Sequence, residues 1–133
     1  MRFLSSFSKF FALLALVAML VIANPVFSSP AEAANYKVIM GAKGLKFKPK
    51  KLTVHPGDTI TFKNGKLAPH NVVFKAKKTG NKKLAKLLSH KELLKEENGS
   101  FDVTIPSDAK PGKYKFFCIP HKGAGMKGKM TIE

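Results

Sequence analysis

The fold of this chain is most clearly indicated by one stretch, Lys113-Tyr114-Lys115-Phe116-Phe117-Cys118-Ile119-Pro120-His121-Lys122-Gly123-Ala124-Gly125-Met126. Residues 113–118 have the character of a short β-strand. The residues that follow bring a thiolate, an imidazole and a thioether into one glycine-rich loop, at Cys118, His121 and Met126. Because copper prefers soft ligands of this kind, the stretch predicts a strand that leads into part of a metal site.

Similar strand patterns recur along the chain. Tyr36, Val38 and Met40 are apolar at alternate positions, and a turn sequence at residues 55–58 precedes another such run. The expected strands cover residues 35–40, 45–48, 51–54, 59–62, 71–74, 101–105, 113–118 and 129–132. Short strands separated by turns, without alternating helices, predict an all-β fold, either an antiparallel sandwich or a barrel.

One segment has helical spacing instead. Leu84, Ala85, Leu87, Leu88 and Leu94 fall mostly on one face, and the residues between them are lysine, serine, histidine and glutamate. This pattern predicts one short surface helix inserted between strands.

The first 33 residues have the features of a secretory signal. Arg2 and Lys9 give a positive start, residues 10–23 form an apolar core, and residues 31–33 form an A-x-A cleavage site. The apolar core of about 14 residues is shorter than the roughly 20 that span a bilayer. We therefore expect a signal peptide over residues 1–33, cleaved near Ala33 or Ala34, and one mature domain over residues 34–133.

The mature domain is strongly basic. The chain has a formal net charge of +16, and removal of Arg2, Lys9 and Glu32 leaves the domain near +15. Such a surface favours acidic partners. Nucleic acid is a rival partner, but the export signal and the absence of arginine from the mature domain argue against it.

The single cysteine of an exported chain cannot form an internal disulfide. Cys118 is therefore an intermolecular partner, a buried bystander or a ligand, and Met126 taken alone is a core methionine. A copper site of the electron-transfer type also needs a second imidazole. His55 and His90 are more simply surface residues, whereas His70 precedes a strand that could aim its ring into the end of a sandwich.

Two segments carry a resemblance to a known family. They are Leu67-Ala68-Pro69-His70-Asn71-Val72-Val73-Phe74 and Cys118-Ile119-Pro120-His121-Lys122-Gly123-Ala124-Gly125-Met126-Lys127-Gly128. Both resemble segments of the plastocyanins, the blue-copper proteins of oxygenic photosynthesis, and the similarity covers essentially the whole mature chain. The resemblance implies a cupredoxin-like Greek-key β-sandwich and one type 1 copper ion that alternates between Cu(I) and Cu(II). It also implies an electron carrier and not an enzyme.

The resemblance implies a set of site residues. The strong ligands would be His70, Cys118 and His121, and Met126 would be the weak axial ligand. Asn71 would tie the His70 segment to the cysteine loop by hydrogen bonds, as supporting residues around metal sites do.

The loop and its surroundings have further expected roles. Pro120 stiffens the turn, while Gly123 and Gly125 let the chain curl so that Met126 returns to the metal. The family usually has tyrosine where this chain has Phe117. An apolar docking patch around His121 is also implied, formed by Leu45, Ala68, Pro69, Pro120 and Ala124.

The resemblance also implies partners and a compartment. A monomer in the thylakoid lumen would take electrons from cytochrome f of the cytochrome b6f complex and deliver them to photosystem I in transient complexes. The basic charge looks cyanobacterial and favours acidic partner surfaces, and a peripheral position at the membrane stays open. The alternatives are a pseudoazurin-like periplasmic electron donor and a copper storage or delivery protein.

Overall fold

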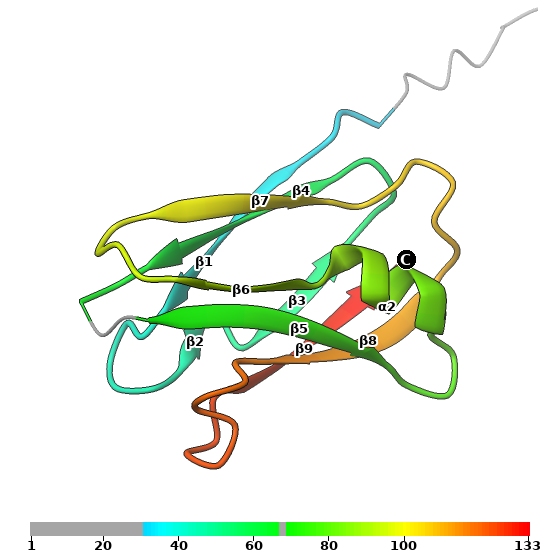
Figure 1. Ribbon diagram of the computed structural model, residues 1–133. Helices are drawn as coiled ribbons and strands as arrows, with labels where there is room; N and C mark the ends of the chain where they lie inside the picture. Colours follow the sequence, from blue (N-terminus) through cyan, green and yellow to red (C-terminus); the bar gives the residue numbers. More distant parts are fainter. Residues whose placement is uncertain (1–30, 67–68) are drawn as a thin grey trace, which may run out of the picture. The chain divides into compact units, whose positions relative to one another are not determined.

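The alternation of apolar and polar residues produces two β-sheets (Figure 1). The computed structural model describes residues 31–66 and 69–133, so the predicted signal lies outside the described residues except for residues 31–33. One sheet has the order β2-β1-β4-β7, formed by Phe47–Lys48, Asn35–Met40, Thr59–Asn64 and Ser100–Thr104. The other has the order β3-β9-β8-β5-β6, formed by Lys51–Val54, Lys127–Ile132, Gly112–Phe117, His70–Ala76 and His90–Leu94.

An aromatic cluster joins the two sheets. Phe47 and Phe62 come from the first sheet, and Phe74 and Phe116 come from the second. The ring centroid of Phe116 lies 4.9 Å from that of Phe47 and 5.8 Å from that of Phe62, and all four rings are buried. The inner face of each sheet packs against the inner face of the other. The apolar side chains between them are therefore removed from water, which stabilises the sandwich. The predicted β-sandwich is confirmed.

Two strand pairs are parallel. Strand β1 pairs with β4 in parallel, as β3 does with β9, whereas the other five pairings are antiparallel. Both sheets are therefore mixed, and the expected antiparallel arrangement holds for five of the seven pairings. Parallel neighbours arise because the chain crosses to the opposite sheet at β3 and returns at β4 beside β1.

The helix is shorter than the leucine spacing indicates. Helix α2 covers Lys82–Leu88, and Asn81 caps it by accepting hydrogen bonds from two backbone N–H groups. The expectation that the helical face extends to Leu94 is wrong, because Ser89 has an extended backbone and residues 90–94 form β6 against β5. In the described part of the chain, no helix is long and apolar enough to cross a membrane.

A buried carboxylate fastens the start of the domain. Asp58 is only 3% exposed and accepts hydrogen bonds from the backbone N–H groups of Ala34, at 2.8 Å, and His55, at 2.7 Å. Burial raises the pKa of Asp58, but these two donors, the nearby His55 ring and the Tyr36 hydroxyl hold it below its ordinary value of 3.8. The ionised form of Asp58 therefore stabilises the folded state.

We expect Asp58→Asn to lower the free energy of unfolding by about 1–2 kcal/mol at pH 7, because an amide cannot accept both hydrogen bonds. The stabilisation by Asp58 is fully present above its unfolded pKa and is lost as the pH falls through its lowered folded pKa. Urea unfolding of both proteins at neutral and at acidic pH checks this. Asp108→Asn, at an exposed position, is the control; a stability difference that stays constant at all pH values would contradict the assignment.

Candidate metal centre

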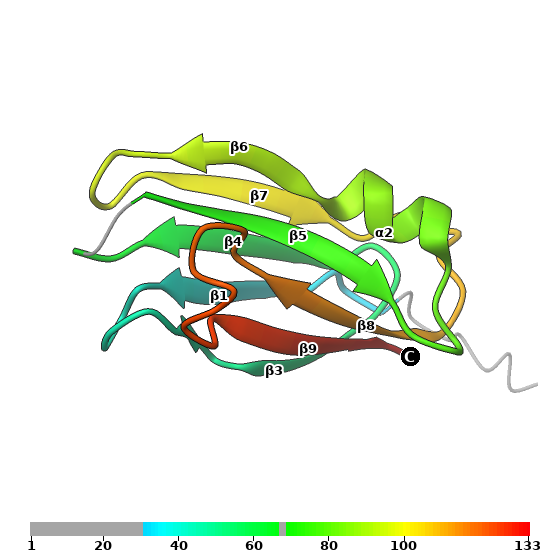
Figure 2. The ribbon, with the colours of Figure 1, turned by 60° about the horizontal axis from the view of Figure 1, so that its bottom comes forward.

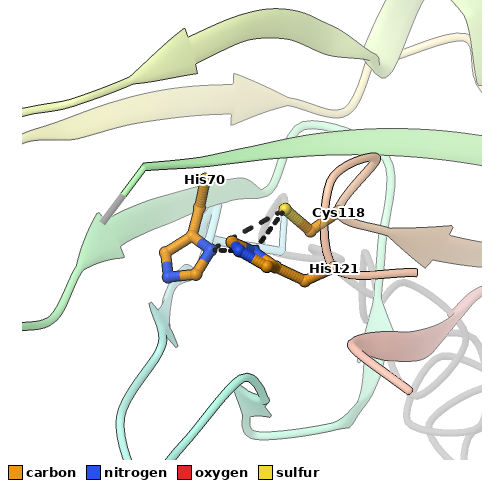
Figure 3. Close-up of side chains that lie close together, drawn as sticks. All are labelled: His70, Cys118 and His121. Carbon is orange, nitrogen blue, oxygen red and sulfur yellow. Dashed lines mark hydrogen bonds between the residues drawn. The ribbon is translucent and has the colours of Figure 1, made fainter. Parts of the chain in front are cut away.

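Three side chains from two distant segments point toward one another at one end of the sandwich (Figure 3). His70 begins β5, Cys118 follows β8 directly, and His121 comes three residues later. The two Nδ1 atoms of His70 and His121 lie 3.1 Å apart. The Sγ atom of Cys118 lies 3.7 Å from Nδ1 of His70 and 3.4 Å from Nδ1 of His121.

The three atoms form a triangle of a size that fits a metal ion. A point equidistant from all three lies about 2.0 Å from each, close to the ~2.0–2.3 Å of imidazole and thiolate bonds known for zinc. In the described residues, this is the one group of three such side chains that could hold a metal. Two imidazoles and a thiolate in a trigonal arrangement are the strong ligands of a blue-copper site.

The surroundings exclude water from most of this site. The side chains of His70, Cys118 and Met126 are fully buried, whereas that of His121 is partly exposed. Two backbone hydrogen bonds close the loop, from the Cys118 N–H to the Met126 carbonyl and from the Met126 N–H to the His121 carbonyl, both at 3.2 Å. The chain therefore returns to the site at Met126 before β9 begins.

The side chain of Asn71 links three parts of the chain. Its Oδ1 atom accepts a hydrogen bond from the Ile119 N–H at 2.8 Å, and its Nδ2 atom donates to the Lys91 carbonyl at 2.7 Å. Asn71 is buried and lies directly after His70. These two bonds fix the start of β5 relative to both the cysteine loop and β6.

The other two histidines lie outside the cluster. His55 is exposed beside Asp58, with 3.6 Å between its Nδ1 atom and Oδ2 of the carboxylate. His90 lies on β6 and stacks on Phe101 with 4.0 Å between ring centroids. Both therefore have neighbours that account for their positions without a metal.

The predicted docking patch around His121 consists of residues that differ in exposure. Pro69, Pro120 and Ala124 are exposed, and Leu45 packs partly against the core. Ala68 lies outside the described residues. The sequence reasoning missed Ile119, whose 52% exposure adds a large apolar side chain to the loop. Ile119 could have been predicted from its place in the sequence, between the candidate ligand Cys118 and Pro120.

Phe117 has a different environment. Its ring is partly buried, and the Nζ atom of Lys122 lies over it, 4.5 Å from the ring centroid. This cation–π contact places a positive charge beside the aromatic residue that precedes Cys118.

A β-sandwich with two imidazoles and a buried thiolate at one end defines the class of cupredoxins. The model of the copper-binding proteins of the plastocyanin/azurin family matches residues 34–133. The chain therefore belongs to this family and is a plastocyanin-type blue-copper protein. Because the family binds copper, copper is the expected cofactor. Plastocyanins are electron carriers and not enzymes, so they transform no substrate.

Individual relatives agree with this family. A plastocyanin of Nostoc punctiforme is 45% identical over an alignment that covers 100% of this chain and 99% of the relative. The structure of oxidised plastocyanin from the fern Dryopteris crassirhizoma is 34% identical, with a TM-score of 0.62, and covers 73% of this chain and 99% of its own. A Sinorhizobium pseudoazurin structure is 28% identical, with a TM-score of 0.53, and covers 75% of this chain and 74% of its own.

Two glycines of the loop give a matched pair of variants. Gly125 has φ +83°, which an L side chain rarely adopts, whereas Gly123 has no positive φ, and a Cβ atom there would meet nothing within 4 Å. We expect Gly125→Ala to destabilise the metal-free protein by about 1–2 kcal/mol. Gly123→Ala should change stability by less than about 0.5 kcal/mol. Urea unfolding measures both, and equal effects would contradict this account of the loop.

Proposed function

We propose that this protein carries single electrons on one type 1 copper ion held by His70, Cys118 and His121, with Met126 as the weak axial ligand. The observation that carries the proposal is the triangle of two Nδ1 atoms and one Sγ atom, with sides of 3.1, 3.4 and 3.7 Å. Bound copper would supply a one-electron couple between Cu(I) and Cu(II).

The protein's part is to hold the ligands still. His70 and Cys118 are fully buried, His70 at the start of β5 and Cys118 directly after the neighbouring strand β8. A hydrogen bond from the Ile119 N–H to Asn71 joins the two segments. A rigid arrangement of this kind lets the oxidation state change with little movement of the ligands. Four protein ligands also leave no open position for a substrate, which supports a carrier over a copper enzyme.

His121 is the proposed route for electrons. Its ring is partly exposed, and the proposed docking patch around it consists of Leu45, Ala68, Pro69, Pro120 and Ala124, to which we add Ile119. A small apolar patch suits brief contact, since weak redox complexes bury little surface. The patch would bring a partner's redox group near the metal without covering the charged sides of the domain.

The proposed partners are cytochrome f as electron donor and photosystem I as electron acceptor, met by a monomer in the thylakoid lumen. The similarity to plastocyanins supports them, and the net charge near +15 favours partners with acidic surfaces. A pseudoazurin-like role in the periplasm is the alternative. The pseudoazurin structure has a lower sequence identity and a lower TM-score than the fern plastocyanin structure. A copper delivery protein is a further alternative, but the buried site disfavours rapid release of the ion.

We also propose that the signal is cleaved after Ala33, so that the mature chain begins at Ala34. The backbone nitrogen of Ala34 lies 2.8 Å from Oδ1 of the buried Asp58. Cleavage at that bond would turn an amide N–H into an α-ammonium group, and the hydrogen bond would become a charge-assisted one.

The mass of the exported protein tests the proposed cleavage. A mature chain that begins at Ala34 is expected, and its stability should exceed that of a chain extended to Ala31 because of the new ion pair. Asp58→Asn should abolish most of that difference. A mature N-terminus at Asn35 or later, or equal stability of the two chains, would contradict the proposal.

Electron transfer from reduced cytochrome f tests the proposed function. On rapid mixing with the oxidised copper protein, one cytochrome should be oxidised for each copper reduced. The rate should fall as salt rises, because ions screen exposed charges beyond about 8 Å at physiological ionic strength.

The same samples separate a carrier from a delivery protein. A carrier should recover its full blue absorbance over repeated cycles in the presence of a Cu(I) chelator, whereas a delivery protein would lose copper to the chelator.

Electron transfer from cytochrome f at a rate that is independent of salt would refute attraction between the lysines and cytochrome f.

A further inference from the structure

One outer face of the five-stranded sheet is covered by lysine. We define the lysine face as the outward side chains of β3, β9, β8 and β5, four neighbouring strands (Figure 2). Inward positions on these strands are apolar residues or glycine, apart from His70 at the start of β5, so the outward positions alternate with the core. Six exposed lysines occupy this face: Lys51, Lys75, Lys113, Lys115, Lys127 and Lys129.

Four of these lysines stand in one row across the sheet. Lys51 is the register partner of Lys129, Lys129 of Lys115, and Lys115 of Lys75. Neighbouring strands lie about 4.8 Å apart, so each ammonium group has like charges on the adjacent strands. Like charges directly opposite each other destabilise a sheet, so the row has an energetic cost in the isolated protein.

Nothing on the face neutralises this charge. No outward position of the four described strands holds an acidic residue, and in the described residues none of the six lysines forms an ion pair. Two acidic residues are at the margins of the sheet, where Glu133 follows β9 and Glu92 lies on β6. A shallow hollow on the face is also lined by lysine, at Lys51, Lys113 and Lys129.

We propose that the lysine face binds the surface of a membrane that contains anionic lipid. Protein interfaces are depleted of lysine and usually have an apolar centre. Lysine and threonine occupy the outward positions around most of this row, and one apolar pair, Val73 and Phe117, lies beside its Lys75–Lys115 end. An anionic lipid surface needs no matched geometry, since each lysine near it adds its own attraction. The chemistry of the face therefore fits a lipid surface better than a protein one.

The position of the row leaves the metal centre accessible. Lys115 lies two residues before the end of β8, and the connection from β8 to β9 that contains His121 begins directly after that end (Figure 2). A molecule bound through the row would keep the apolar patch free for a partner in the same membrane. The proposal needs no copper and does not depend on the proposed function.

Sedimentation with lipid vesicles tests the proposal. Wild-type protein, both metal-free and copper-loaded, is mixed at 0.1 M salt with vesicles of phosphatidylcholine alone or with one third phosphatidylglycerol. We expect equal binding of both forms to the anionic vesicles and none to the neutral ones. A variant in which Lys51, Lys75, Lys115 and Lys129 are all changed to glutamine should bind at least about 100-fold more weakly.

The control removes the same charge elsewhere. Lys37, Lys43, Lys48 and Lys110 are exposed and lie outside the five-stranded sheet, so their replacement by glutamine should weaken binding less than about fivefold. Thermal unfolding should show that the row variant is at least as stable as the wild type, because repulsion is relieved.

Three results would overturn the proposal. Equal losses in the two variants would show that net charge alone binds lipid. Absence of wild-type binding to anionic vesicles would show that anionic lipid is not the partner of this face. Unchanged vesicle binding by the row variant, together with weaker binding to an acidic protein such as cytochrome f, would assign the face to a protein.

Discussion

Antiparallel pairing between β5 and β8 is the constraint on which the metal centre depends. Val73 is the register partner of Phe117, so the residues that precede Val73 lie beside the residues that follow Phe117. This register brings Asn71 to the Ile119 N–H and places His70 near Cys118, although 48 residues separate them in the chain. A slip of one residue would turn Cys118 from the buried face to the solvent face, and the triangle of ligand atoms would be lost.

Packing beneath β8 supports this register. Phe116, one position before Phe117, contacts Phe47 and Phe62 of one sheet and Phe74 of the other, and it lies over Gly128 on β9. A Cβ atom at Gly128 would collide with the Phe116 ring, so only glycine leaves room for that ring. The same strand therefore directs Phe116 into the core and Lys115 into solvent, and it ends one residue before Cys118. Alternate side chains along β8 therefore face the core or the lysine face, and Cys118 continues the inward set to the metal centre.

The sequence predicted what is local and missed what depends on distant neighbours. Alternating residues were enough for most strands, and the order Cys118, His121 and Met126 was enough for the loop. The helix was extended too far because Leu94 continues the leucine spacing, whereas pairing with β5 makes residues 90–94 a strand. The parallel pairs, the contact from Ala34 to Asp58 and the row of lysines depend on strand register, which a single sequence does not specify.

Preorganisation of the proposed copper site at His70, Cys118 and His121 can be measured by titration of the metal-free protein with Cu(II), followed by visible absorption. We expect an intense blue colour that saturates at one copper per chain and is absent from Cys118→Ser, while that variant still shows the far-ultraviolet circular dichroism of a β-sandwich. A colourless complex of the wild type, or a blue one of Cys118→Ser, would contradict this proposal.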